Sequence, residues 1–129
     1  MKGLDTPVLV HLLHGSPSAQ ALLKSLRGEE LATTELNLYE LGVLAAQGPR
    51  SARGARLKAL AGLRRRISVL PIGPAATEEA QRLSSGLGRT SGYEAIVWGA
   101  MISAGCQEWI TTKAYAPAKP LPGMKVRVL

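Results

Sequence analysis

The sequence predicts a single α/β domain, residues 1–129, built around a mostly parallel central sheet. Short runs of β-branched and aliphatic residues alternate with longer segments of helical apolar spacing, which is the pattern of parallel strands joined by helices. A length of 129 residues fits one domain. With 46% hydrophobic and 19% charged residues, the composition is that of a globular rather than a disordered protein.

The first half of the chain is predicted to contain two strands and four helices. The strands are residues 1–4 and 31–34. A helix over residues 8–13 follows the start signal Asp5–Thr6–Pro7, and Gly15 ends it. The remaining helices are expected from Ser16–Pro17 to Leu26, from a capping box at residues 37–40 to Gln47, and over residues 51–65 with Leu57, Leu60 and Leu63 buried.

The second half is predicted to contain three strands and two helices. The strands are residues 67–71, 107–111 and 125–129. One helix is expected to be capped by Thr77 and closed by Gly86 and Gly88. A capping box at residues 91–94 opens the second helix, which runs to Ala104. Three prolines make residues 114–123 a loop.

The charge balance predicts a polyanionic partner. Sixteen Lys and Arg against nine Asp and Glu give a net charge of +7, which favours nucleic acid or an acidic protein as the partner. The alternative is that this charge only keeps the protein soluble. The run Arg64, Arg65 and Arg66 is read with equal weight as an RNA-phosphate contact or as a solvated helix face. Cys106 is the single cysteine, which excludes an internal disulfide and favours a reducing, cytoplasmic compartment. Neither export nor a membrane span is expected.

Three carboxylates fall at positions where an α/β sheet places functional groups. Asp5, the only Asp of the chain, directly follows the first predicted strand, and Glu40 and Glu94 lie at predicted helix starts. If the sheet brings them together, the cluster requires a cation, and hard Mg²⁺ or Mn²⁺ suits oxygen ligands. The alternative is that all three are only helix-capping residues, which on spacing alone is the more common case.

Five short motifs stand in order along the chain. They are residues 3–6 (GLDT) followed by Leu9 and Leu13, residues 33–41 (TTELNLYEL), residues 68–72 (SVLPI), residues 92–96 (GYEAI) and residues 110–113 (ITTK). Over essentially the full length, their order and spacing resemble the PIN domain family, in particular the small VapC-like toxins of toxin–antitoxin pairs. The acidic motifs of that family correspond here to Asp5, Glu40 and Glu94.

The resemblance implies a three-layer α/β/α sandwich and a metal-dependent ribonuclease. Asp5, Glu40 and Glu94 would be the catalytic carboxylates that hold Mg²⁺ or Mn²⁺ for hydrolysis of RNA phosphodiester bonds. Thr6, Thr111 and Lys113 would support the site or contact a phosphate. The resemblance further implies a homodimer and a small antitoxin partner whose tail blocks the site.

Two positions depart from the family pattern. Glu94 stands where the family usually has Asp, and its extra methylene shifts the carboxylate. Lys113 stands where the family often has Asp or Asn, and a charged Lys cannot bind a metal. They indicate a weaker site, and they motivate an alternative: a PIN fold without catalysis that binds RNA or a partner. A small-molecule enzyme is a third hypothesis, for which no nucleophile–base pair is visible.

The remaining polar and aromatic residues give weaker signals. His11 and His14 lack a further nitrogen or sulfur ligand nearby in sequence, so zinc is not expected. Cys106 and Trp98 are expected in the core. The aromatic residues are too scattered in sequence to predict a base-stacking platform, although Tyr93 and Tyr115 lie near predicted site loops.

Overall fold

The computed structural model describes residues 1–87 and 92–129. Within these residues the elements, in chain order, are β1 (Lys2–Leu4), α1 (Thr6–His14), α2 (Pro17–Ser25), β2 (Leu31–Thr34), α3 (Glu35–Ala46), α4 (Arg50–Arg64), β3 (Ser68–Leu70), α5 (Pro74–Leu87), α6 (Gly92–Ser103), β4 (Glu108–Thr111), the 3₁₀ turn η1 (Lys113–Tyr115) and β5 (Lys125–Val128). No helix in the described ranges combines the length and the apolar character that crossing a bilayer requires.

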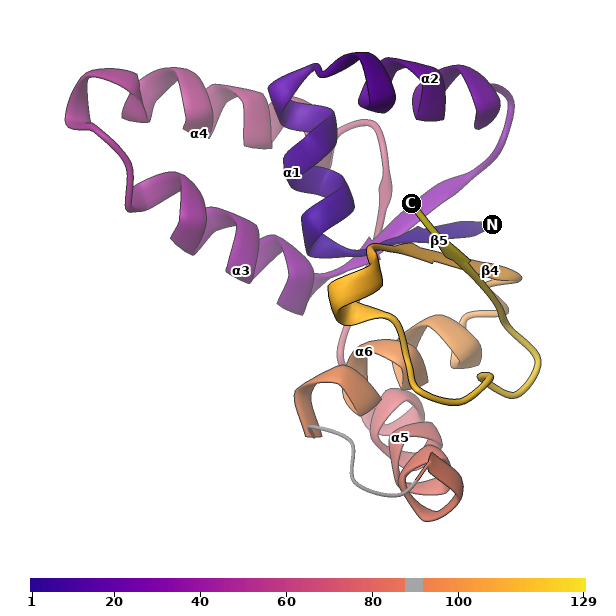
Figure 1. Ribbon diagram of the computed structural model, residues 1–129. Helices are drawn as coiled ribbons and strands as arrows, with labels where there is room; N and C mark the ends of the chain where they lie inside the picture. The colour runs from indigo at the N-terminus through magenta and orange to yellow at the C-terminus, as the bar shows by residue number, and fades with distance from the viewer. Residues whose placement is uncertain (88–91) are drawn as a thin grey trace.

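The strands form one five-stranded sheet in the order β3-β2-β1-β4-β5, and every neighbouring pair is parallel. Figure 1 shows α1 and α2 on one side of the sheet and α5 and α6 on the other, while the hairpin of α3 and α4 projects away from the sheet. The predicted α/β class and three-layer arrangement are therefore confirmed. The parallel pairing is more complete than the sequence indicated, because β5 also runs parallel to β4.

The alternation of side chains along β1 and β4 divides the core into two clusters. Leu4 and Ile110 pack with α1, α2 and α3 on one face of the sheet. The preceding residues of the two strands, Gly3 and Trp109, pair with each other and face the other side of the sheet. There Trp109 packs with α6 residues such as Trp98. The tertiary structure thus buries Trp98, as expected, and Cys106 lies in the same cluster.

Two glycines permit close approaches on the α5–α6 side of the sheet. A Cβ on Gly3 would lie 2.7 Å from the six-membered ring of Trp109, so the missing side chain lets the indole lie across β1. A Cβ on Gly99 would collide with the backbone of Ala76 and Ala80, because α5 and α6 pack there almost backbone to backbone. Neither backbone segment can yield as a flexible side chain could.

Replacing Gly99 by Ala is expected to destabilise the protein by about 2–4 kcal/mol, because overpacking here must separate two helices. The free energy of unfolding in urea measures this. Gly54→Ala is the matched control: Gly54 lies inside α4 with open space around its Cα, so its replacement should stabilise by about 0.5–1 kcal/mol. Equal effects from the two variants would contradict the close packing of α5 and α6.

Two predicted helix starts are wrong. The helix expected from Asn37 begins at Glu35, because Thr34 is its N-cap and forms a capping box with Asn37. The helix expected from Thr77 begins at Pro74. Thr77 lies within its first turn, and the Thr77 hydroxyl donates to the carbonyl of Pro74 instead of capping. In both cases the helix begins a few residues before the predicted start: Thr34 caps α3, and Pro74 is the first residue of α5.

Other expectations need smaller corrections. Leu57 is 47% exposed rather than buried, since α4 has no buried residue and only Leu60 and Leu63 pack against the core. The last strand ends at Val128, one residue before its predicted end. Ser91, the cap of the box expected at residues 91–94, and Gly88, an expected helix stop, lie outside the described residues.

Candidate functional site

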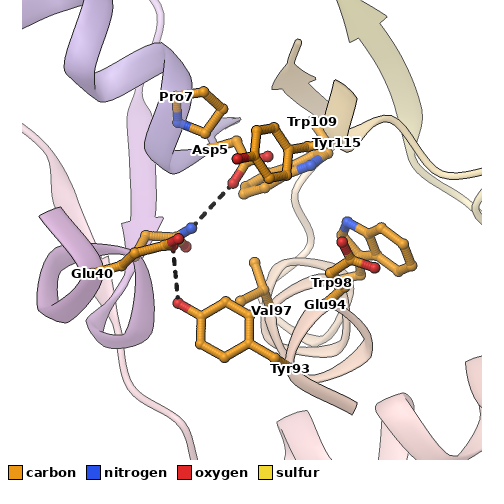
Figure 2. A pocket seen from close by; sticks show the side chains of 10 residues that line it. Asp5, Pro7, Glu40, Tyr93, Glu94, Val97, Trp98, Trp109 and Tyr115 are labelled. Carbon is orange, nitrogen blue, oxygen red and sulfur yellow. Dashed lines mark hydrogen bonds between the residues drawn. The ribbon is translucent and has the colours of Figure 1, made fainter. Parts of the chain in front are cut away.

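The position of β1 in the sheet determines where a site can form. From β1 the chain first passes to β2 on one side, and it later returns to β4 on the other. Ligands of open α/β sheets bind at the carboxyl ends of the strands where the order reverses in this way. A cavity of about 110 Å³ lies at that place (Figure 2), lined by Asp5, Pro7, Asn37, Glu40, Tyr93, Glu94, Val97, Trp98, Trp109 and Tyr115.

Asp5 is held by donors from three elements. One carboxylate oxygen accepts from the backbone N–H of Thr6 at 2.8 Å, which makes Asp5 the N-cap of α1. The same oxygen accepts from the side-chain amide nitrogen of Asn37 at 3.3 Å. The other oxygen accepts from the hydroxyl of Thr111 at the end of β4, at 2.6 Å. Asp5 can therefore cap α1 and belong to the candidate site at the same time.

Burial raises the pKa of Asp5 above its usual value. The hydrogen bonds from Thr111 and Thr6 favour the carboxylate and oppose this shift, while the nearby charges of Glu40 and Glu94 add to it. The net effect is a raised pKa, so an ionised Asp5 destabilises the folded chain when no cation is bound. A bound cation would relieve that cost.

Glu40 projects into the cavity from the second turn of α3. One oxygen accepts from the Thr6 hydroxyl at 2.7 Å. The same oxygen accepts from the Tyr93 hydroxyl at 3.2 Å, and Figure 2 draws this second contact. The helix is already capped by Thr34 and Asn37, so Glu40 is not a capping partner. Burial and the charge of Glu40 raise the pKa of Tyr93, which therefore stays protonated and can donate.

Glu94 lies in the first turn of α6 and lines the same cavity. The three predicted carboxylates are therefore brought to one place, from three different elements. Within residues 1–87 and 92–129, however, no three His, Cys, Asp or Glu side chains approach closely enough to enclose an ion. The all-oxygen donor set fits a hard divalent cation such as Mg²⁺ or Mn²⁺, and holding one there requires the carboxylates to draw closer.

Asn37 is a site residue whose role the sequence did not reveal. It is fully buried, and its amide nitrogen also donates to the Thr6 hydroxyl at 3.1 Å. Its carbonyl oxygen accepts from the hydroxyl of Thr34 at 2.7 Å. Asn37 thus links the start of α3 to Asp5 and Thr6. From the sequence, Asn37 was interpreted only as part of a helix-capping box, so its hydrogen bonds to Asp5 and Thr6 were not predicted.

The cationic residues that were expected to contact RNA do not line this cavity. Lys113 begins the exposed turn η1 and does not line the cavity. Arg64, Arg65 and Arg66 are exposed at the end of α4. Arg64 pairs with Glu35 at 2.8 Å and lines a separate hollow between α3 and α4. His11 and His14 are exposed on α1.

Aromatic side chains line the cavity beside the carboxylates, a shared position that their scatter in sequence did not indicate. Both tryptophans and two of the three tyrosines line the cavity. Trp98 and Trp109 are buried, whereas Tyr93 and Tyr115 are partly exposed at its edge. The only signal of this arrangement in the sequence was that Tyr93 and Tyr115 lie near predicted site loops.

Comparison with known proteins identifies the family. The sequence profile of the PIN domain matches residues 3–111, which is most of the chain. A comparison with curated proteins gave no significant match.

Three solved structures illustrate the similarity of the fold. A chain of VapBC2 from Rickettsia felis, crystallised bound to a promoter DNA fragment, has a TM-score of 0.82 and 14% identity, over 99% of this chain and 98% of that one. DNA-bound VapBC from Salmonella typhimurium gives 0.80 and 18%, over 98% and 96%. VapC20 from Mycobacterium tuberculosis, a Sarcin-Ricin loop cleaving toxin, gives 0.62 and 18%, over 84% and 87%. At these identities the fold is what is shared.

Proposed function

Since this chain belongs to the PIN domain family, we propose that it is a Mg²⁺- or Mn²⁺-dependent endoribonuclease that acts as the toxin of a toxin–antitoxin pair. The observation that carries the proposal is the convergence of Asp5, Glu40 and Glu94 on one cavity at the carboxyl end of β1. Burial raises the pKa of Asp5, and the nearby charges of Glu40 and Glu94 add to that shift, so a bound cation would relieve the cost of keeping Asp5 ionised. A cation beside a phosphodiester is the arrangement of many nucleases.

In this proposal Asp5, Glu40 and Glu94 hold the cation, which supplies Lewis-acid stabilisation of the charge that develops on the phosphodiester. Thr111, Thr6 and Asn37 keep the Asp5 carboxylate oriented through their hydrogen bonds. Thr6 and Tyr93 do the same for Glu40. Donors that fix a ligand's orientation in this way commonly matter almost as much as the ligand itself.

The proposed partners are RNA, a small antitoxin and a second copy of the chain. The net charge of +7 favours a polyanion. Similar structures include toxin–antitoxin complexes, such as one from Klebsiella pneumoniae with a TM-score of 0.75 and 18% identity. Arg65, Arg66 and Lys113 are exposed and available to contact RNA phosphates away from the cavity. Arg64 would first have to leave its pairing with Glu35.

The direct test is cleavage of a pool of single-stranded and structured RNAs by the protein expressed alone. Cleavage is expected with Mg²⁺ or Mn²⁺, and it should stop with chelator and in Glu40→Gln. Glu35→Gln is the matched control, because Glu35 lies on the same helix but pairs with Arg64 outside the cavity. Absence of cleavage from folded protein with either metal would refute the nuclease proposal.

The second candidate is an RNA- or partner-binding module without catalysis. It is favoured by the absence, among the described residues, of a ready-made cluster of metal ligands, and by Lys113 and Glu94 at their family positions. This function predicts RNA binding that persists in chelator and weakens steeply with salt. RNA binding measured by filter retention across a salt series, with and without chelator, distinguishes the two candidates.

A further inference from the structure

The positive charge of the chain is concentrated in one short segment. Residues 50–66 carry seven Lys and Arg and no Asp or Glu, whereas the rest of the chain has nine cations and nine anions. The net charge of +7 therefore comes entirely from α4 and the two arginines that follow it. Among residues 1–87 and 92–129, Arg64 is the only member of this segment in an ion pair, with Glu35.

The helix α4 carries this charge against the local preferences of a helix. A helix N-terminus favours negative charge and a side-chain cap. By contrast, α4 begins with Arg50, has no acidic residue in its first turn and has no side-chain cap hydrogen bond at Pro49. Arg50, Arg53 and Arg56 then follow at three-residue spacing, which places like charges next to one another. Breaking several local rules in one segment is typical of a functional surface.

The outward face of α4 alternates cations with small residues. It consists of five exposed positions at helical spacing, Arg50, Gly54, Lys58, Ala61 and Arg65. At 1.5 Å per residue this face is about 22 Å long. The helix packs against the core through Leu60 and Leu63 instead. Leu57, the large apolar residue beside the outward face, lines the hollow between α4 and α3.

The chemistry of the outward face favours the phosphate backbone of a base-paired nucleic acid as its occupant. A stable protein interface needs a buried apolar centre, which these five positions do not supply. Sites for single strands add aromatic side chains on which bases stack, and the outward face has none. Base-paired RNA is instead held through its phosphates and 2′-hydroxyls. The open space around Gly54 lets such a backbone approach between the cations.

One end of α4 lies next to the elements that form the candidate site. Arg64, in the last turn of α4, pairs with Glu35, the first residue of α3. The carbonyl of the next residue, Leu36, accepts from the hydroxyl of Tyr93, which lines the cavity. Arg50 is at the opposite end, where the hairpin of α3 and α4 projects away from the sheet (Figure 1). A rod-shaped ligand along α4 would therefore point toward the start of α3.

We propose that the outward face of α4 is a docking site for base-paired RNA, which it holds by the phosphates without reading the base sequence. Arg50, Lys58 and Arg65 make the contacts, and the small residues between them let the RNA backbone come close. The proposal deepens the ribonuclease function proposed above and rests on it for the choice of RNA over DNA. The docking site is separate from the carboxylate cavity, whose lining includes no residue of α4.

The test measures binding in chelator, so that it does not depend on cleavage. The probes are a fluorescein-labelled RNA hairpin, an unpaired RNA of the same length and a DNA hairpin of the corresponding sequence. One triple variant carries Arg50→Gln, Lys58→Gln and Arg65→Gln, which remove the charges and keep good helix formers. The matched control carries the same change at three exposed cations outside α4, Lys24→Gln, Lys119→Gln and Lys125→Gln.

Fluorescence anisotropy over a salt series gives the affinity and its salt dependence. At about 0.1 M salt, the α4 variant should bind the RNA hairpin at least about tenfold more weakly than wild type. The slope of log affinity against log salt should become shallower by about 2–3, because each phosphate contact contributes roughly 0.7–0.9. The control variant should lose less than about threefold, since distant surface charges are screened. Circular dichroism checks that both variants keep their helix content.

Each outcome has a defined meaning. Equal losses in the α4 variant and the control would overturn the proposal, because binding would then follow net charge alone. Wild-type protein that binds the unpaired RNA or the DNA hairpin as tightly as the RNA hairpin would also overturn it. Binding of polyaspartate that requires α4, with RNA binding unaffected by the α4 variant, would assign the face to an acidic protein instead.

The docking proposal and the nuclease proposal can fail separately. Binding of the RNA hairpin that depends on α4, by a protein that cleaves no RNA with either metal, would support the docking site and refute the nuclease. Metal-dependent cleavage by a protein whose hairpin binding is unchanged in the α4 variant would support the nuclease and refute the docking site.

Discussion

Asp5→Asn is expected to lower metal-dependent RNA cleavage by about 10²–10³-fold or more while making the metal-free protein more stable. The amide keeps the shape of the carboxylate and one acceptor for the Thr6 backbone N–H. It removes a charge that burial disfavours and that the charges of Glu40 and Glu94 disfavour further. Function and stability should therefore change in opposite directions.

The pH dependence follows from the direction of the Asp5 shift. Because the pKa is raised on folding, the folded chain binds the Asp5 proton more tightly than the unfolded chain does. The resulting stability is complete below the unfolded value of 3.8 and is lost as the pH rises through the folded pKa. Asp5→Asn should thus gain about 0.5–2 kcal/mol at pH 7, and the gain should shrink in acid.

Urea unfolding of the metal-free wild type and Asp5→Asn at several pH values measures this, together with cleavage under Mn²⁺. Added Mn²⁺ should raise the stability of the wild type and leave that of the variant nearly unchanged. A variant less stable than wild type at pH 7 would show that the hydrogen bond from Thr111 outweighs the cost of burying the Asp5 charge. Retained cleavage would exclude Asp5 from the catalytic set.

Asn37→Asp is expected to destabilise the metal-free protein by about 2–4 kcal/mol at neutral pH. The substitution preserves volume and keeps an acceptor for the Thr34 hydroxyl, so the start of α3 retains its cap. The amide nitrogen that lies 3.3 Å from Asp5 becomes a carboxylate oxygen. Two buried like charges at that distance repel strongly.

The repulsion at Asn37→Asp should be relieved by protons or by a divalent cation. Thermal unfolding should therefore show a smaller loss at acidic pH and a partial recovery with Mn²⁺. Gln81→Glu is the matched control, since it adds the same charge on an exposed position of α5. Asn37→Asp as stable as this control, with no response to Mn²⁺, would contradict close contact between Asn37 and Asp5 and a cation site beside them.

Much of the fold could be predicted because its signals are local. Alternating short apolar runs and helical spacing gave the α/β class and the order of the elements, and Asp5 could be placed at the end of β1 from its neighbours alone. Local signals were ambiguous where two capping patterns overlap at residues 34–40. Only the end of β2 at Thr34 and the burial of Asn37 decide between them, in favour of the earlier start.

The sequence by itself therefore determined the class of the fold, its family resemblance and three acidic positions. The tertiary structure decided the strand order, the two roles of Asn37 and the gathering of Trp98, Trp109, Tyr93 and Tyr115 around Asp5. The physical reason is that periodicity records which face of an element is apolar, whereas convergence depends on register and on side-chain direction across the sheet. Trp109 lies above β1 only because β4 pairs with β1 in this register and Gly3 leaves the space.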